Sequence, residues 1–320
     1  MTRVLITGSH GFVGNALFQR LRAEGCDPLR VSRQALRPSE LAVGEIDLTT
    51  DWSKALIDGA VVIHLAARVH VMHDTEADPV TAFRVVNLQG TLNLARQAAA
   101  AGVKRFVFIS SIKVNGESTE PEQSFTEADP PNPQDAYGRS KQEAEQGLRQ
   151  LSADTGMEVV IIRPPLVYGP GVKANFASLM RAVQRGWPLP LGAVHNQRSF
   201  VALDNLVDFI VNCITHPQAA NQNFLVSDGE DLSTPDLIRR MARAMNRPAR
   251  LLQVPVWALR AGALLLGKGD AVQRLCGNLQ VDISKSRTLL GWNPPISVDE
   301  GLRRAVGGPR SCGTRSRADW

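Results

Sequence analysis

Tyr137 and Lys141 are the two residues whose types and spacing best suit chemistry. They lie four residues apart in Tyr137-Gly-Arg-Ser-Lys141, so on a helix both side chains share one face. A phenol titrates near about 10, but an ammonium group beside it favours the phenolate and lowers its pKa. Such a pair can exchange a proton with a carbinol oxygen. Alone, the same spacing is typical of an ordinary solvated helix face, so the surrounding elements decide its meaning.

Two serines precede this pair at the end of an expected strand. Residues 105–110 are short, apolar and rich in aromatic and β-branched side chains, which predicts a buried parallel strand ending at Ser110-Ser111. A polar loop over about 114–134 then leads to the helix that carries Tyr137. Ligands of open parallel sheets bind at the carboxyl ends of strands. We therefore expect Ser111 to hydrogen-bond the reacting oxygen while Tyr137 shuttles its proton.

A glycine-rich turn near the N-terminus predicts a dinucleotide cofactor. Residues 3–7 read as a buried strand, Gly8-Ser-His-Gly11-Phe-Val-Gly14 follows, and an amphipathic helix continues to about Glu24. Glycines let the backbone approach a pyrophosphate, and the free N–H groups and positive dipole end of the helix attract it. The spacing is Gly-x-x-Gly-x-x-Gly, and its place between strand and helix makes it specific.

The second expected strand, residues 27–32, points to the type of dinucleotide. In an NAD site its end carries an acid for the ribose hydroxyl, but here Ser32-Arg33 follows. An arginine with a small hydroxyl suits a 2′-phosphate, so we favour NADP over NAD. The alternative is that Arg33 is simply exposed. Residues 45–48 predict a short strand end beside the adenine, which would bring Asp47 and Leu48 to the cofactor.

The remaining periodicity indicates an α/β, Rossmann-type doubly wound parallel sheet with a smaller, interleaved C-terminal substrate lobe. Further strands are expected at 61–65 and 158–163, and Asp78-Pro79 opens a long helix to about Ala101. His64 is expected to be packed within its strand, and His70 and His73 to lie on the surface without a metal. Prolines and glycines break the pattern from about 165. We divide the chain into a cofactor domain (1–164), a substrate lobe (165–306) and a disordered tail (307–320).

Composition excludes several classes of protein. The 320 residues carry a formal charge of +5, but residues 303–320 hold five arginines against one aspartate, so we attribute the basicity to this tail and expect no nucleic-acid partner. The four cysteines lack metal or redox spacing, which suits a reducing cytoplasm. The longest apolar run, 261–267, is too short to span a membrane.

Several motifs together resemble one family. They are Gly8-x-x-Gly11-x-x-Gly14, His64-Leu-Ala-Ala67, Asn87-x-x-Gly90-Thr91, Ser110-Ser111, Tyr137-x-x-x-Lys141, Arg163-Pro164-x-x-Val167-Tyr-Gly-Pro170 and Arg198-Ser-Phe-Val201. In this order they resemble the extended short-chain dehydrogenases/reductases of the nucleotide-sugar epimerase/dehydratase group. Residues 111–116 and 192–205 resemble a bacterial branch that acts on UDP-N-acetylhexosamines in O-antigen and other surface-polysaccharide pathways.

The resemblance implies roles for individual residues. Ser111, Tyr137 and Lys141 would be catalytic, and Asn87 would hold the helix that bears Tyr137, or a water near it. The residues expected to contact the cofactor are Gly8, Gly11, Phe12, Val13, Gly14, Arg33, Asp47, Leu48, Leu65, Ala66, Ala67, Asn87, Ser110, Tyr137, Lys141, Pro164 and Pro165. The residues expected to contact the UDP-sugar are Ser111, Lys113, Asn175, Arg198 and Arg274. Lys113 would select an anionic or acetamido sugar, or point outward as an ordinary surface lysine.

Three functions remain open at this point. We favour reduction of the C4 keto group of a UDP-4-keto-6-deoxy-N-acetylhexosamine, because Arg33 suits an exchangeable NADPH. A UDP-sugar 4-epimerase with retained NAD, acting on UDP-glucose or UDP-N-acetylglucosamine, would use the same residues. A cofactor-sensing protein without catalysis is the third hypothesis. The family often pairs through two long helices, here about 79–101 and 136–155, so we also expect a homodimer.

Overall fold

The computed structural model describes residues 3–37, 39–57, 59–69, 78–265 and 269–307. Its centre is a seven-stranded sheet in the order β3-β2-β1-β4-β5-β6-β9. Every neighbouring pair is parallel, which confirms the predicted doubly wound architecture. The strands are β1 (Arg3–Thr7), β2 (Asp27–Ser32), β3 (Leu41–Ala42), β4 (Val61–His64), β5 (Arg105–Ile109), β6 (Glu158–Arg163) and β9 (Asn223–Leu225).

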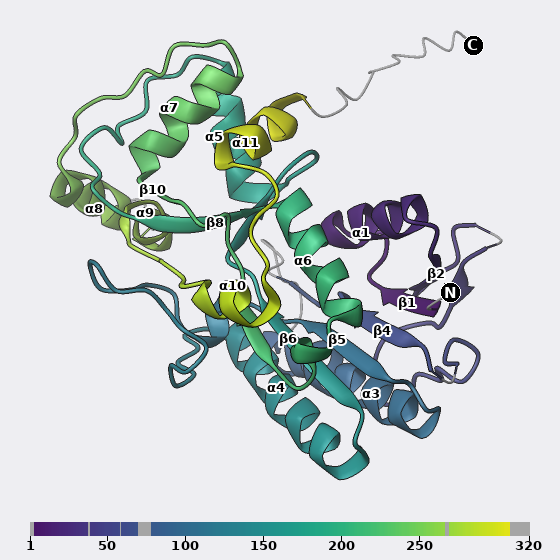
Figure 1. Ribbon diagram of the computed structural model, residues 1–320. Coiled ribbons are helices and arrows are strands. Elements are labelled where there is room, and N and C mark those ends of the chain that lie inside the picture. The colour runs from purple at the N-terminus through teal and green to yellow at the C-terminus, as the bar shows by residue number, and fades with distance from the viewer. Residues whose placement is uncertain (1–2, 38, 58, 70–77, 266–268, 308–320) are drawn as a thin grey trace, which may run out of the picture.

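Alternating apolar side chains bury both faces of this sheet. Val4 and Ile6 of β1 face one core, where α1 (Phe12–Ala23) and α6 (Leu203–Thr215) cover the sheet. Leu5, between them, faces the opposite core together with α3 (Thr91–Ala100) and α4 (Ala136–Thr155). Figure 1 shows α3 and α4 side by side on their face of the sheet. The period of two along each strand is what lets one sheet support two helical layers.

Two predicted elements differ from the structure. Residues 45–48 form no strand, because the Asp47 carboxylate accepts hydrogen bonds from the Thr49 amide and hydroxyl and closes a turn. The third strand is β3 instead. The predicted helix over 79–101 is divided into α2 (Pro79–Phe83), the π-helix η1 (Arg84–Gly90) and α3. This π-helix contains Asn87, in agreement with the tendency of such segments to occur at functional sites.

The smaller lobe is built on a three-stranded sheet in the order β10-β8-β7. Its strands are β7 (Leu166–Tyr168), β8 (Arg198–Ala202) and β10 (Asp231–Leu232). Its helices are α5 (Ala174–Gln184), α7 (Thr234–Ala244), α8 (Val256–Leu265), α9 (Gly269–Cys276) and α11 (Val298–Gly307), with α10 (Ser284–Leu290) beside the large sheet. Tyr168, Phe200 and Met241 lie in its separate core.

The two lobes interleave along the chain. The chain enters the smaller lobe at β7, returns to the large sheet with α6 and β9, and leaves it again at β10 (Figure 1). Short 3-10 turns, η2 (Ile112–Val114) and η3 (Pro217–Ala219), complete the described elements. Across the residues that the structure describes, no helix is long and apolar enough to cross a membrane. The predicted tail beyond Gly307, as well as His70 and His73, lies outside the described residues.

Candidate active site

Helix α4 places Tyr137 and Lys141 at the carboxyl edge of the large sheet. The helix begins where the Asp135 side chain accepts a hydrogen bond from the Gly138 amide, 2.7 Å away. One turn later the Lys141 side chain is 1% exposed, and its ammonium donates to the Ile109 carbonyl at 2.8 Å. Because Ile109 ends β5, this bond ties the helix to the strand that precedes Ser111.

The structure brings Ser111 and Tyr137 into contact. The Ser111 side chain is close enough to the Tyr137 hydroxyl to act on its pKa. The backbone of Ser111 is extended, and its Oγ accepts from the Lys113 amide at 3.2 Å. The Tyr137 ring also meets the Phe83 ring edge-on, with a centroid distance of 6.1 Å. Ser111, Tyr137 and Lys141 therefore form one cluster around the end of β5, as the sequence predicted.

Burial sets the protonation of this cluster. It raises the pKa of Tyr137 to about 12, with the Asp135 charge acting in the same direction and the Ser111 hydrogen bond opposing it. Burial also lowers the pKa of Lys141 to about 7, against the charge of Glu145. The expectation that the ammonium group lowers the phenol pKa is therefore wrong for this structure. At neutral pH Tyr137 is a neutral phenol that can donate a proton.

A buried ion pair beneath Lys141 was missed by the sequence analysis. Arg163 donates two hydrogen bonds to the Glu145 carboxylate, at 2.9 and 2.5 Å, and both side chains are 3% exposed. The Ser110 hydroxyl donates to the same carboxylate at 2.6 Å, so it contacts the protein interior. Arg163 also donates to the Asn115 side chain at 2.8 Å. The sequence does contain a pattern that indicates Glu145 as part of the site: Tyr137, Lys141 and Glu145 are spaced four residues apart along one helix face.

Asn87 connects three segments around the site. Its side chain is fully buried and accepts from the Arg68 amide at 2.8 Å. Its amide nitrogen donates to the Arg68 carbonyl and to the Ser140 hydroxyl, at 3.0 and 3.1 Å. Since Ser140 precedes Lys141, Asn87 holds the helix bearing Tyr137, as expected.

The glycine turn fits a pyrophosphate. A side chain at Gly14 would overlap the Gly8 carbonyl oxygen, and one at Gly8, where φ is +66°, would lie 2.7 Å from the Ala66 nitrogen. Helix α1 has neither a side-chain cap at Gly11 nor an acidic residue in its first turn. Its first N–H groups are thus left for an anion. The buried Ser9 hydroxyl also has no hydrogen-bond partner within the described structure.

The other expected cofactor residues surround this turn or follow neighbouring strands. Phe12 and Val13 begin α1 and pack partly against the core. Leu65, Ala66 and Ala67 follow β4, and Pro164 and Pro165 follow β6, so all five lie at the same edge of the sheet. His64 is packed, as predicted: it bonds the Thr7 and Thr91 hydroxyls, and burial together with the Lys141 charge lowers its pKa to about 3.

The adenosine end of the expected cofactor site differs from the sequence-based interpretation. Arg33 is exposed and forms an ion pair with Glu45, 3.3 Å away. Asp47 is held in its turn through Asn93, whose amide donates to the Asp47 carbonyl at 3.0 Å, and the following Leu48 is exposed. This exposed pair is weak, so it neither excludes nor supports a contact between Arg33 and a 2′-phosphate, and both NAD and NADP stay compatible with this end of the site.

A carboxylate that the sequence analysis did not single out lies next to the glycine turn. The Glu40 side chain is 1% exposed and bonds the His10 ring, at 3.1 Å, and the Leu36 amide, at 2.9 Å. Burial would raise the pKa of Glu40, but these hydrogen bonds and the nearby charges of His10 and Arg30 lower it. Its Oε1 atom has no partner among the described residues. A buried, ionised oxygen is thus left for a ligand hydroxyl.

The smaller lobe brings two of the expected substrate residues together. Arg198 begins β8 and donates to the Gly277 carbonyl at 3.1 Å. Burial and the charge of Arg274, on α9, lower the pKa of Arg198, which places the two cations close to each other. Two adjacent guanidinium groups suit a diphosphate. Asn175 is exposed at the start of α5.

Lys113 is engaged by protein carboxylates. Its ammonium pairs with Glu117 at 2.9 Å and with Asp135, the residue that caps α4. These contacts favour a role in fixing the start of the catalytic helix over contact with the sugar.

A cavity of about 390 Å³ lies between the loop after Ser111 and helix α9. Its lining is mostly polar and consists of Asn115, Gly116, Glu117, Ser118, Phe125, Asn132, Gln134 and Gln273. Gln273 precedes Arg274, and Glu117 is close enough to Arg198 to raise its pKa. The cavity therefore extends from the loop that follows Ser111 toward the arginine pair.

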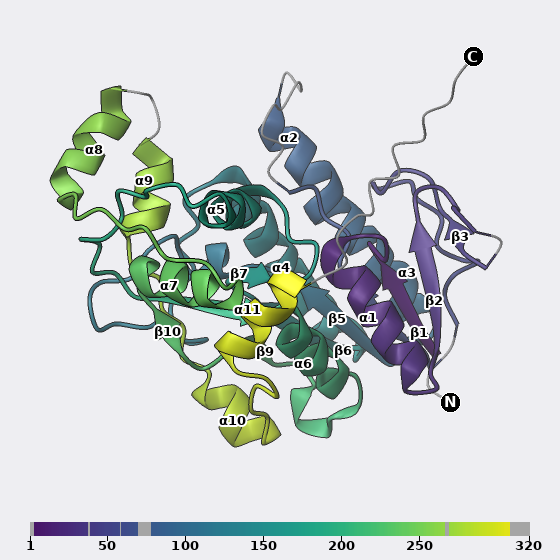
Figure 2. The ribbon, with the colours of Figure 1, turned by 90° about the horizontal axis from the view of Figure 1, so that it is seen from above.

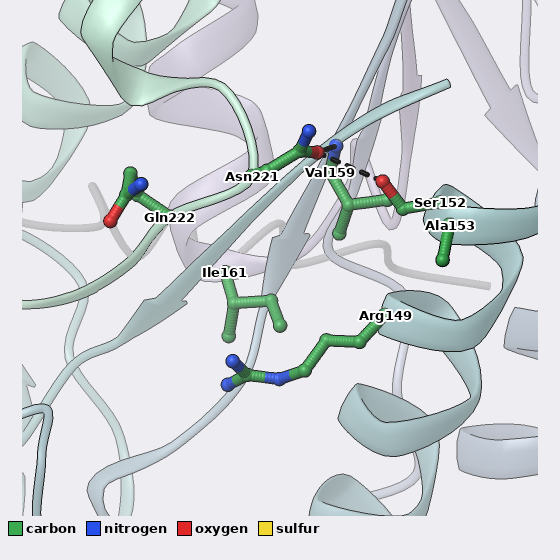
Figure 3. Close-up of a pocket in the computed structure, with 7 residues that line it drawn as sticks. All are labelled: Arg149, Ser152, Ala153, Val159, Ile161, Asn221 and Gln222. Carbon is green, nitrogen blue, oxygen red and sulfur yellow. Dashed lines mark hydrogen bonds between the residues drawn. The ribbon is translucent and has the colours of Figure 1, made fainter. Parts of the chain in front are cut away.

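A second pocket lies away from this chemistry. It has a volume of about 340 Å³ and lies between the C-terminal half of α4 and the start of β6. Figure 3 shows the Asn221 side chain bridging Ser152 and Val159 at its rim, while Arg149 extends from α4 along the opposite side. It includes none of the expected site residues. Across the described part of the chain, no group of three or more His, Cys, Asp or Glu side chains could hold a metal ion.

Comparisons with known proteins agree with this geometry. Residues 4–227 match the model of the NAD dependent epimerase/dehydratase family. A Vibrio cholerae protein named UDP-glucose 4-epimerase is 51% identical over 308 residues, covering 95% of this chain and 94% of the relative. An Escherichia coli O157:H7 protein, N-acetyl-alpha-D-glucosaminyl-diphospho-ditrans,octacis-undecaprenol 4-epimerase, is 27% identical, covering 95% and 94%. The structure of UDP-glucuronic acid 4-epimerase from Bacillus cereus with NAD superposes with a TM-score of 0.76 at 22% identity, covering 96% and 98% of the chains.

Proposed function

Because the chain belongs to the NAD dependent epimerase/dehydratase family, we propose that it is a UDP-sugar 4-epimerase that retains NAD and acts on UDP-glucose or UDP-N-acetylglucosamine. The observation that carries the proposal is the 51% identity with the UDP-glucose 4-epimerase of Vibrio cholerae along nearly the whole chain. The cluster of Ser111, Tyr137 and Lys141 supports it chemically, because inversion at C4 needs a proton to leave and return at one oxygen.

The bound NAD would supply the hydride acceptor and donor of the reaction. Ser111 would hydrogen-bond the C4 oxygen of the sugar and stabilise the carbonyl that forms there. Tyr137 would accept the C4 hydroxyl proton in its minor phenolate form. As the neutral phenol that prevails at neutral pH, it would return that proton to the same oxygen after the keto-sugar has turned over. Lys141, one helical turn away, would contact the cofactor. Its ammonium does not set the pKa of Tyr137, because burial dominates there. The buried position of Lys141 keeps water away from its ammonium.

The residues around the glycine turn would hold the cofactor. The free N–H groups of α1 would bind the pyrophosphate, and Glu40 would accept a hydrogen bond from the adenosine ribose in place of an acid at the end of β2. Arg33 was the reason to favour a reductase with exchangeable NADPH. Arg33 pairs only weakly with Glu45, so this residue does not decide between the two reactions; the 51% identity with a UDP-glucose 4-epimerase is why we now favour the epimerase.

The substrate would extend across both lobes. Arg198 and Arg274 would bind the diphosphate, Asn175 would contact the nucleotide, and the cavity beside Ser111 would receive the sugar. The Escherichia coli relative is named for a sugar joined to undecaprenol through a diphosphate, which agrees with the expected role in surface-polysaccharide synthesis. A homodimer formed through α3 and α4 and a cytoplasmic location stay predictions.

Isotope retention tests the proposal. UDP-glucose deuterated at C4 is incubated with the purified protein without added cofactor, and the sugar is analysed by NMR and mass spectrometry. We expect UDP-galactose that keeps deuterium at C4, because the hydride leaves and returns within one active site. We expect Tyr137→Phe to lower kcat by about a hundredfold or more, the range typical of a lost general acid or base.

The alternatives give different results in the same assay. A keto-reductase would leave UDP-glucose unchanged and would consume NADPH stoichiometrically with a UDP-4-keto-sugar. A protein without catalysis would bind cofactor but convert neither substrate. Exchange of the C4 deuterium with solvent would also contradict the proposed return of the hydride.

A further inference from the structure

Helix α8 of the smaller lobe exposes large apolar side chains. Trp257 is 74% exposed and Leu264 is 75% exposed. Arg260 and Ala261 are exposed as well, so the outward positions follow the i, i+3, i+4, i+7 spacing of a single helix face. This face contains one charge and otherwise only apolar residues.

The opposite face of α8 is apolar too. Val256 and Leu259 pack against the core of the smaller lobe, and Ala263 is buried. A helix that is apolar on both faces is normally covered on both. Its outward face is therefore suited to an apolar environment outside the chain.

Two more exposed side chains belong to the same end of the lobe. Trp187 is 54% exposed and Leu252 is 51% exposed. Their segments are paired, because the Leu252 amide donates to the Leu189 carbonyl at 2.8 Å. We call Trp187, Leu252, Trp257 and Leu264 the outer apolar surface. Figures 1 and 2 both show α8 and α9 at the outer end of the smaller lobe, away from α3 and α4.

This end of the lobe is strongly basic. Residues 171–202 contain four Lys or Arg side chains and no acid, and residues 243–276 contain six against one aspartate. The net charge of +1 outside residues 303–320 conceals these two basic segments, because the other segments are acidic in sum. The Arg185 guanidinium lies 5.2 Å from the centre of the Trp187 ring, so a cation and an aromatic ring are already combined there.

We propose that the outer apolar surface docks onto the surface of an anionic lipid bilayer. Tryptophan, leucine and arginine on one short helix are the combination found in helices that lie in the membrane interface. Trp257 and Leu264 enter the boundary between headgroups and acyl chains, while Arg260 stays at the phosphates. With ten residues, α8 is about 15 Å long and lies on the bilayer without spanning it.

Charge selects the bilayer over a second copy of the chain. A symmetric dimer through this surface would bring the basic segments of both copies together, and like charges repel. An anionic lipid surface attracts the same segments. The inference does not depend on the reaction proposed above.

Vesicle sedimentation tests the docking. The full chain is mixed with vesicles of phosphatidylcholine alone or with phosphatidylglycerol added, and bound protein is measured at increasing salt. We expect binding to the anionic vesicles that weakens with salt, and little binding to the neutral ones. In Trp257→Ser/Leu264→Ser we expect partitioning at least about tenfold weaker, because two large apolar groups no longer enter the interface.

Leu36→Ser is the matched control, since Leu36 is 68% exposed but lies in the cofactor lobe. We expect this variant to bind vesicles like the wild type and all variants to keep the unfolding temperature of the wild type. Wild-type protein that binds neither vesicle, or both equally, would overturn the docking. Vesicle binding that persists in the double variant would also overturn the docking, because it would point to the basic tail as the binding segment. A dimer that ultracentrifugation finds in the wild type and the control, but not in the double variant, would show that the surface binds a second copy instead.

Discussion

Arg163 and Glu145 form a buried ion pair directly beneath the catalytic helix face, with both side chains 3% exposed. Arg163 ends β6 and Glu145 lies one turn beyond Lys141, so the pair ties the carboxyl edge of the sheet to α4. Glu145 also raises the pKa of Lys141 against the effect of burial. The pair thus both holds α4 against the sheet and favours the protonated form of Lys141.

Removing the Glu145 side chain should lower the free energy of unfolding far more than removing the neighbouring Glu143 side chain. Glu145→Ala leaves the Arg163 charge buried and unpaired, which we expect to destabilise the protein by about 3–5 kcal/mol. Glu143→Ala breaks only the partly exposed pair with Arg84 and should cost about 0–1 kcal/mol. Urea unfolding measures both. Equal losses in the two variants would show that the buried pair has no special role.

The stability of the protein should depend on Lys141 between pH 7 and 10.5. Burial lowers the pKa of Lys141 from 10.5 to about 7, so within this window the unfolded chain binds the proton and the folded protein does not. The contribution of this group to stability therefore rises with pH across the window. Relative to the wild type, Lys141→Met should be more stable at pH 6.5 than at pH 9.5, by on the order of a few kcal/mol. A difference independent of pH would contradict the lowered pKa.

Cofactor affinity should depend on Glu40 and not on Arg33. Glu40→Gln replaces an ionised acceptor near the glycine turn, and we expect NAD to bind about tenfold more weakly, the effect of one hydrogen bond to a charged group. Arg33→Ala should leave the affinity for NAD within about twofold, because Arg33 is exposed and pairs only weakly with Glu45. Calorimetric titration of both variants with NAD and NADP measures this. A selective loss of NADP binding in Arg33→Ala would restore the interpretation drawn from the sequence.

Lys113 should act on the catalytic helix and not on the sugar. Lys113→Met removes the ion pairs with Asp135 and Glu117 at the start of α4. We expect an unfolding free energy lower by about 1 kcal/mol and a KM for the UDP-sugar within about twofold of the wild type. Arg198→Ala is the comparison variant, and its KM should rise by about tenfold or more. A large rise in KM for Lys113→Met would assign it to the substrate.

The sequence by itself determined the architecture and the placement of the proposed catalytic group. Both follow from local rules: strands of period two, a turn that only glycines at positions such as Gly8 and Gly14 can form, and a helix that places Tyr137 above Lys141. Ser111 followed because the carboxyl ends of parallel strands meet at one edge. These relationships hold within one element or between consecutive elements, so the order of residues is sufficient to predict them.

Only the tertiary structure decided what each charged side chain contacts. Arg33 pairs with Glu45, Lys113 pairs with Asp135 at the cap of α4, and Glu40 bonds His10 of the glycine turn. Each contact crosses a loop, and the path of a loop does not follow from sequence periodicity. The pKa of Tyr137 is raised because its burial depends on all the surrounding elements together. The outward face of α8 likewise appears only when the helix is placed on its core. Partners and desolvation depend on distances through space, and the sequence alone does not contain them.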